Sequence, residues 1–226
     1  MTDLVWPAGV LPPRAPRYSI RYQTRRGPQS FEGVSQVVAS NAAFWVVTFA
    51  TIPIATAEQV KAWRAMSMGC AGRRNPILLP VISAIAPLPV GATPVVPVPH
   101  SDGTYFSDGS GYVGTNNDVV LAGAIVVGAT TARVTQSFGG LLEPGQDFSI
   151  GERLYRINTV AAVTDSATDY DISFMPPARE AALAGVRMEF DKPVIKARLK
   201  TDNAMDDPFD LLRFATPTVE FVEDLT

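Results

Sequence analysis

The chain has 226 residues, of which 46% are hydrophobic and 18% are charged, and its net charge is −3. Such a chain can bury a sizeable core, so we expect one globular domain or two small ones. Its single cysteine, Cys70, excludes an intramolecular disulfide framework. The N-terminus has no basic region followed by an apolar run, so we expect no secretory signal and synthesis in the cytosol.

Charge is distributed unevenly along the sequence. Residues 1–75 hold nine Lys or Arg against three Asp or Glu, a balance of +6, whereas residues 76–226 hold ten against nineteen, a balance of −9. This asymmetry fits nucleic-acid contact by the basic part, a subunit whose faces meet complementary neighbours, or scattered solvated charge. No RNA-stacking or helix-turn-helix motif accompanies the densest basic cluster, so we expect no sequence-specific nucleic-acid partner. That cluster is Arg14, Arg17, Arg21, Arg25 and Arg26.

The first predicted elements are strands. Residues 1–29 form a Pro- and Arg-rich arm that contains a short strand candidate at 18–23. Two runs rich in β-branched or aromatic residues follow at 30–39 and 43–52, and each is long enough for a paired strand. The turn-forming dipeptide Ser40-Asn41 separates them. The pattern predicts a β-hairpin with its turn at Ser40-Asn41.

One amphipathic helix is predicted after this hairpin. Thr56-Ala-Glu-Gln59 fits a capping box, in which the threonine hydroxyl accepts a backbone N–H and the glutamine reaches back. Gly69 and Gly72 are candidate helix ends. On this helix Cys70 is expected to be a buried core thiol rather than a nucleophile. The positions that follow at helical spacing are Val60, Trp63, Met66 or Ser67, and Cys70.

Residues 75–99 contain no charged residue, but they are not expected to span a membrane. Seven prolines interrupt the stretch, and proline inside a helix removes a hydrogen bond. We therefore expect extended chain and linker, with a short strand at 77–82, covered by the core or by a partner subunit. The prolines are Pro76, Pro80, Pro87, Pro89, Pro94, Pro97 and Pro99.

Residues 119–190 read as a small β domain. Strand-like runs occur at 119–127, 132–136, 171–175 and 186–190, and turns at Pro144-Gly145 and Gly151-Glu152 flank a tight hairpin. Short strands at such regular spacing are typical of a small barrel or sandwich.

The end of the chain returns to longer strands at 193–200 and 214–223. Because no partner strand lies nearby in sequence, we expect both to pair with the N-terminal hairpin. The predicted class is mainly β: a split β-barrel or sandwich with one flanking helix, plus an inserted small β-barrel-like domain. The predicted domains are 1–80 with 191–226 as a discontinuous ring-forming (belt) unit, 81–118 as a Pro- and Gly/Asp-rich linker and loop, and 119–190 as the insertion.

Residues that could carry chemistry are few. His100 is the only histidine, so a triad would need Ser101 or Ser107 and Asp102 or Asp108, and no Gly-x-Ser-x-Gly elbow occurs. Phosphate-binding glycine loops are also missing from the sequence. We predict no catalytic residue, no cofactor and no metal site, although two clusters of oxygen-bearing side chains fit either turns or calcium. They are Asp102, Asp108, Asn116, Asn117 and Asp118, and Asp202, Asp206, Asp207 and Asp210. The second, acidic cluster also fits the paired carboxylates of a glycosidase, although a solvated turn is favoured.

Three aromatic residues, Tyr105, Phe106 and Tyr112, lie in the Gly/Ser/Asp loop at 100–118. They are the candidate ligand or partner contacts of the sequence. They fit stacking on sugar rings, insertion into a neighbour's pocket, or a loop tip that is merely aromatic.

Three stretches of the chain carry a resemblance to a known group. The first is Ser30-Phe-Glu-Gly33 and Phe44-Trp-Val-Val-Thr-Phe49, followed by Ala57-Glu-Gln-Val-Lys-Ala-Trp63 and Gly69-Cys-Ala-Gly-Arg-Arg-Asn-Pro-Ile77. The second is Glu143-Pro-Gly-Gln-Asp-Phe-Ser-Ile-Gly-Glu-Arg-Leu-Tyr-Arg-Ile157. The third is Arg213-Phe-Ala-Thr216 with Val219-Glu-Phe-Val-Glu-Asp-Leu225. In this order they resemble tail proteins of tailed dsDNA bacteriophages, most closely the distal tail protein group at the baseplate.

The resemblance implies a split β-barrel with a flanking helix, assembled as a hexameric ring at the distal end of the tail tube. It also implies a second β domain facing outward, no enzymatic activity, and a place in the virion tail after synthesis in the host cytoplasm. The implied partners are the tail tube protein and tail hub, tip or baseplate proteins. Residues 75–118 do not match the group. Three alternatives stay open: a carbohydrate- or receptor-binding module, a tail tube subunit, and a hydrolase using the 100–118 loop.

Overall fold

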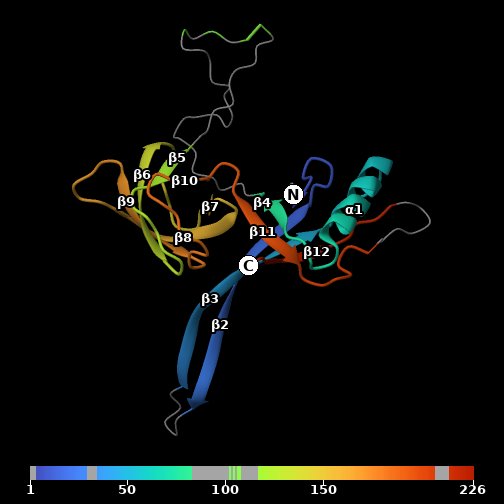
Figure 1. Ribbon diagram of the computed structural model, residues 1–226, viewed down its shortest axis with the longest axis horizontal. Helices are drawn as coiled ribbons and strands as arrows, with labels where there is room; N and C mark the ends of the chain where they lie inside the picture. Colours follow the sequence, from blue (N-terminus) through green and yellow to red (C-terminus); the bar gives the residue numbers. More distant parts are fainter. Residues whose placement is uncertain are drawn as a thin grey trace.

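The computed structural model describes residues 4–29, 35–82, 102, 104, 106–107, 117–206 and 214–226 (Figure 1). Within these ranges the protein has twelve strands and one helix, which confirms the mainly β class. The strands form two sheets of six strands each. In the same ranges, no helix has both the length and the apolar character that crossing a membrane requires.

The first sheet brings together the two ends of the chain. Its strand order is β1-β4-β11-β12-β3-β2. β12 pairs antiparallel with β3, and β11 pairs antiparallel with both β12 and β4. The expectation that both C-terminal strands pair with the N-terminal hairpin is therefore met by β12, which pairs with β3, but is wrong for β11, which lies between β12 and β4. The strands are β1 (Leu4–Val5), β2 (Ala15–Gln29), β3 (Ser35–Ala50), β4 (Ile77–Pro80), β11 (Val194–Leu199) and β12 (Val219–Glu223).

The predicted hairpin turn at Ser40-Asn41 is wrong. β3 continues through this dipeptide, and its partner is β2, which is much longer than the predicted strand at 18–23. Between the pairs Arg21↔Phe44 and Gln23↔Ser40, the register shifts because β3 contains extra residues. The turn-forming dipeptide is thus absorbed by a β-bulge, which bends a long ribbon without reversing the chain. Residues 30–34, between β2 and β3, lie outside the described residues.

The inner face of the first sheet carries an aromatic core. Trp45 and Phe49 lie on the same face of β3, and both are fully buried. Phe49 meets Trp6 edge-on at a centroid distance of 5.3 Å and Phe221 at 5.7 Å. Such T-shaped pairs add about 0.5–1.5 kcal/mol each beyond the area they bury. These rings therefore fix the N-terminal segment and β12 against β3.

The first sheet also curls toward itself. Tyr18 lies on the edge strand β2, yet its hydroxyl donates to the Pro80 carbonyl at 3.0 Å and accepts the Ile82 N–H at 2.9 Å. Burial raises the pKa of Tyr18 to about 12, so the hydroxyl remains protonated and can donate. The Tyr18 side chain therefore links β2 to the end of β4 on the other side of the sheet.

The helix α1 (Ala57–Cys70) packs on the aromatic core through Trp63, Met66 and Cys70. The predicted capping box is confirmed, because Thr56 Oγ1 accepts the Gln59 N–H at 3.2 Å and Gln59 Oε1 accepts the Thr56 N–H at 3.1 Å. Replacing such a cap by alanine typically costs about 1 kcal/mol.

Of the two glycines predicted to end the helix, Gly69 and Gly72, only Gly72 lies beyond its last residue, Cys70. The helix is closed by Ala71 in the left-handed region at φ 48°, followed by Gly72 at φ 66°. Gly69 lies inside the helix, so the prediction that it ends there is wrong. A Cβ at Gly69 would lie 2.9 Å from Leu4 Cδ1, so this glycine allows β1 to approach the helix.

The second sheet is barrel-like and nearly closed. Its strand order is β10-β5-β6-β9-β8-β7. The two edges meet at a pair of backbone hydrogen bonds. The Ser149 N–H donates to the Glu189 carbonyl at 2.9 Å, and the Glu189 N–H donates to the Ser149 carbonyl at 2.8 Å. Its strands are β5 (Asp118–Leu121), β6 (Thr131–Phe138), β7 (Asp147–Ile150), β8 (Arg153–Ala162), β9 (Asp169–Met175) and β10 (Arg187–Met188).

Several strands of the second sheet begin or end at residues other than those predicted. The strand expected at 119–127 ends at Leu121, after which the chain loops out and touches the sheet through an Ile125–Ala182 bridge. The predicted tight hairpin is confirmed: Ile150 pairs with Arg153 across a two-residue turn that begins with Gly151 at φ 59°. The core beneath this hairpin is built on Phe148, Tyr155, Phe174 and Phe190.

The two sheets share a buried contact. Leu154 of β8 packs within the core of the first sheet, and its carbonyl accepts Trp45 Nε1–H at 2.8 Å. The Arg156 guanidinium lies 5.0 Å from the Trp45 ring centroid. Strand membership divides the chain into β1–β4 with β11–β12, and β5–β10. The domain boundaries 1–80, 119–190 and 191–226 stay a prediction, and residues 81–118 lie largely outside the described part.

Candidate functional site

The most prominent surface feature is a two-stranded ribbon that projects from the first sheet (Figure 1). β12 pairs with β3 only over Val46–Phe49, whereas β2 and β3 stay paired to Gln29↔Ser35. Beyond the bulge, no strand of the described part of the chain lies beside these two as a third. We call the paired residues 23–29 and 35–40 the arm.

A groove lies where the arm joins the sheet. It has a volume of about 430 Å³ and faces away from the aromatic core. The Tyr22 side chain, 60% exposed, forms part of it, and the Lys200 ammonium beside it pairs with Glu220 at 2.5 Å. This base groove is lined by Arg21, Tyr22, Gln23, Phe44, Val46, Lys200 and Val222. Apolar side chains and basic groups thus meet at the base of the arm.

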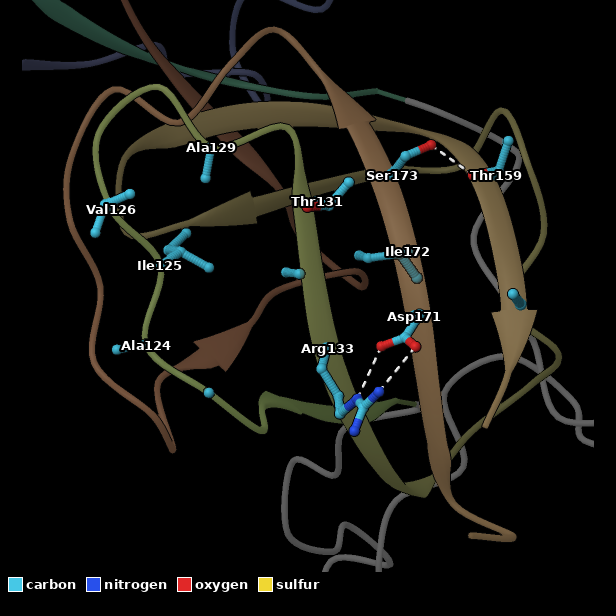
Figure 2. Close-up of a pocket in the computed structure, with 13 residues that line it drawn as sticks. Ala124, Ile125, Val126, Ala129, Thr131, Arg133, Thr159, Asp171, Ile172 and Ser173 are labelled. Atoms are coloured by element: carbon cyan, nitrogen blue, oxygen red, sulfur yellow. Dashed lines mark hydrogen bonds and ion pairs between the residues drawn. The ribbon is translucent and has the colours of Figure 1, made fainter. Parts of the chain in front are cut away.

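A second hollow, of about 620 Å³, lies on the outer face of the second sheet (Figure 2). Strands β6, β9 and β8 form its floor, and the loop over residues 123–129 forms one wall. Arg133 and Asp171 lie side by side on the floor, and Thr159 and Ser173 form a hydroxyl pair. We call this the barrel pocket; its lining includes Val126, Thr131, Arg133, Thr159, Asp171 and Ser173.

Between the sheets lies a buried ionic cluster rather than an open site. Glu223 of β12 accepts Nε–H of Arg179 at 2.8 Å and the backbone N–H of Trp45 at 2.9 Å. Arg179 Nη2 also donates to the Ala43 carbonyl. We call these four residues the Glu223 cluster. Because every charge in it is paired, it is suited to holding the sheets together rather than to proton transfer.

The C-terminal residues are held by two further arginines. Arg153, with 5% of its side chain exposed, donates to the Asp224 and Thr226 carbonyls, and Arg198 pairs with the Asp224 carboxylate at 2.9 Å. Burial by itself raises the pKa of Asp224, but hydrogen bonds from Arg198 and Thr226 outweigh it and hold that pKa below its usual value.

The sequence-predicted contact residues are only partly covered by the structure. Tyr105 and Tyr112 lie outside the described residues, as does His100. Phe106 is described and 42% exposed. The role of these three aromatic residues therefore stays a prediction.

Three members of the oxygen-bearing clusters have structural partners. Asp102 accepts the Thr104 N–H at 3.0 Å and hydroxyl at 2.7 Å, which forms a local turn. Asn117 is buried and its amide donates to Asp191 at 2.8 Å. Asp202 pairs with Arg73 at 3.2 Å. Among the described residues, no three His, Cys, Asp or Glu side chains gather where they could hold a metal ion.

Cys70, the last residue of α1, is fully buried in the core, as predicted. Burial raises the pKa of its thiol to about 11, so the reactive thiolate is scarce near neutral pH.

Two features of the surface were not predicted from the sequence. The arm was missed because Ser40-Asn41 was interpreted as a turn. The barrel pocket was missed because its residues come from three strands; the only signal is that Thr131 and Arg133, and Asp171 and Ser173, alternate with core residues. Comparison with known proteins found no family model and no curated protein that matches this chain.

Proposed function

We propose that this protein is a structural subunit of a bacteriophage tail, which forms an oligomeric ring of six copies at the distal end of the tail tube. In this role it links the tube protein to hub, tip or baseplate proteins and carries out no catalysis. The observation that supports the proposal is the arm, a long ribbon that has no third strand among the described residues. The resemblance of the three sequence stretches supplies the phage context.

The arm needs a partner for a physical reason. An isolated two-stranded ribbon is at best marginally stable in water, because it buries little apolar surface and leaves two edges unpaired. The arm of this chain extends well past the last β3–β12 pair at Val46↔Val222. A neighbouring copy that covers the arm would supply the missing contacts.

A ring follows if the arm meets a different surface on its neighbour. Contacts between unlike patches repeat around an axis and close into a ring when the rotation permits. The charge balance favours this arrangement, because residues 1–75 carry +6 and residues 76–226 carry −9. Arg25 and Arg26 belong to the β2 part of the arm, so we expect it to lie against the acidic part of the next copy.

The two sheets then have different roles in the proposal. The first sheet and α1, over 1–80 and 191–226, would form the split barrel that builds the ring, with the β2–β3 ribbon and β11 toward the lumen. The second sheet, over 119–190, would be an inserted domain that faces outward. A tail tube subunit remains the alternative within the same structural class.

Negative-stain imaging of the purified full chain at high concentration tests the proposal. We expect rings with a central hole and six-fold averages. Particles that stay single at every concentration, together with intact phage tails that contain no ring of this protein, would contradict it.

A further inference from the structure

The barrel pocket carries a row of hydroxyl groups on adjacent strands. In the antiparallel register, Ser173 of β9 lies opposite Thr131 of β6 on one side and opposite Thr159 of β8 on the other. The Thr159 and Ser173 hydroxyl oxygens are 2.5 Å apart, as Figure 2 shows. Each hydroxyl can both donate and accept a hydrogen bond. The row therefore presents donors and acceptors to the hollow without adding charge.

The next row of the floor is an ion pair with matched geometry. Arg133 Nε donates to Asp171 Oδ1 at 2.8 Å and Nη2 donates to Oδ2 at 3.0 Å. Both side chains are about half exposed, at 54% and 52%. The Arg133 hydrogen bond lowers the pKa of Asp171, so the pair stays ionised at neutral pH. Its charges cancel, yet the remaining N–H groups and oxygen lone pairs face the hollow.

The remaining wall is apolar and held in place. Ile125 is anchored by its backbone bridge to Ala182, and the Gly128 N–H donates to the Ala178 carbonyl at 2.7 Å. Figure 2 shows Ile125 and Val126 on this loop, beside β6. Because the loop is fixed by backbone hydrogen bonds, the wall needs little ordering when a ligand enters.

We propose that the barrel pocket binds a neutral saccharide. A sugar ring offers hydroxyl groups on its edge and C–H groups on its face, which match the hydroxyl row, the ion pair and the apolar loop wall, where Val126 is exposed and Ile125 is buried against the core of the second sheet. An anionic ligand is disfavoured, because the cation in the lining, Arg133, is already neutralised by Asp171. Nucleic acid is disfavoured for the same reason, since phosphate contacts dominate its affinity. The volume of about 620 Å³ lies within the range of small-ligand sites.

This inference does not depend on ring formation, because every contributing residue comes from one copy. It also differs from a site at Tyr105 and Tyr112, which lie in another part of the chain. The two locations can therefore be separated by substitution.

A glycan array probed with the labelled full chain tests the proposal, with neutral and sialylated glycans side by side. Calorimetry with a neutral glycan that binds then measures affinity. We expect at least a tenfold loss in the double variant Arg133→Ala/Asp171→Ala, which removes the pair without leaving one charge alone. Ala161→Trp should block binding while keeping every polar group, because Ala161 lines the pocket and its side chain is exposed.

The matched control is Arg73→Ala/Asp202→Ala, which removes a similarly exposed ion pair between the turns that follow α1 and β11, outside the second sheet. It should leave affinity unchanged, and thermal unfolding should show that all variants are folded. Three results would overturn the proposal. They are no binding of any neutral glycan at millimolar concentration, binding of sialylated glycans alone, and binding that survives both pocket variants but is lost in Tyr105→Ala/Tyr112→Ala.

Discussion

The buried carboxylate of Glu223 accepts the backbone N–H of Trp45 at 2.9 Å, across 178 positions of the chain. With only 2% of its side chain exposed, Glu223 also pairs with Arg179, which follows β9 of the second sheet. One acid therefore joins β12 to β3 and ties the second sheet to the first. The Glu223 cluster is thus one of several buried polar connections between the two halves of the fold.

Removing this acid should destabilise the protein strongly. Glu223→Ala leaves the Arg179 guanidinium and the Trp45 N–H without their buried partner, and breaking such a pair costs about 3–5 kcal/mol. Glu223→Gln keeps an acceptor for Trp45 and should lose less. Urea unfolding at a fixed protein concentration measures the free energy of unfolding.

The control for this prediction is Arg73→Ala, which removes one member of an exposed ion pair. Exposed pairs contribute little, so a much smaller loss is expected. Equal losses in Glu223→Ala and Arg73→Ala would show that the Glu223 cluster does not hold the sheets together.

Asp224 should make stability depend on acid pH. Its pKa is lower in the folded protein than in the unfolded chain, so the unfolded chain binds the proton first as the pH falls. The stabilisation that the charged Asp224 contributes is therefore full above about pH 4, the ordinary aspartate range. It is lost as the pH falls through the pKa of Asp224 in the folded protein.

The measurement is the stability difference between wild type and Asp224→Asn at several pH values. We expect wild type to be more stable at pH 7 and the difference to shrink below about pH 4. A difference that stays constant down to acid pH would rule out the charged Asp224–Arg198 contact as its source.

Cys70 should be unreactive in the native protein. Its thiol is fully buried and has a pKa of about 11, so both access and thiolate formation are restricted. A thiol reagent at pH 8 should modify the native chain far more slowly than the chain unfolded in urea. Similar rates in both states would show that the core under α1 opens readily.

The parts of the fold that were predictable depend on local sequence. The Thr56–Gln59 cap was found because both partners lie within one helical turn, and the β7–β8 hairpin was found because Gly151 marks a two-residue turn. The prediction of a turn at Ser40-Asn41 was wrong because it, too, depended on local sequence alone. Its local turn preference was overruled by pairing with β2, a partner whose length the sequence did not reveal.

The candidate sites were less predictable because their residues come from distant positions. Arg179 lies 44 residues from Glu223 and 136 from Ala43, and no periodicity connects them. Likewise, Arg133 and Asp171 are 38 residues apart, and only the register of β6 and β9 brings them together.

Shortening the arm should abolish assembly without unfolding the subunit. Gln23 and Ser40 are paired, so a two-residue Asn-Gly turn can join them and replace residues 24–39. The described members of the aromatic core lie elsewhere in the chain, so we expect the melting temperature of the shortened chain to stay close to that of a wild-type monomer. A shortened chain that still forms the same particles would remove the arm from the account.

The most direct test of the account is the mass of the wild-type and shortened chains in solution, measured by light scattering after size exclusion. We predict roughly 145 kDa for wild type, which is six copies of a 24.2 kDa chain, and the mass of a single copy for the shortened chain. A wild-type mass of 24.2 kDa at every concentration tested would contradict it.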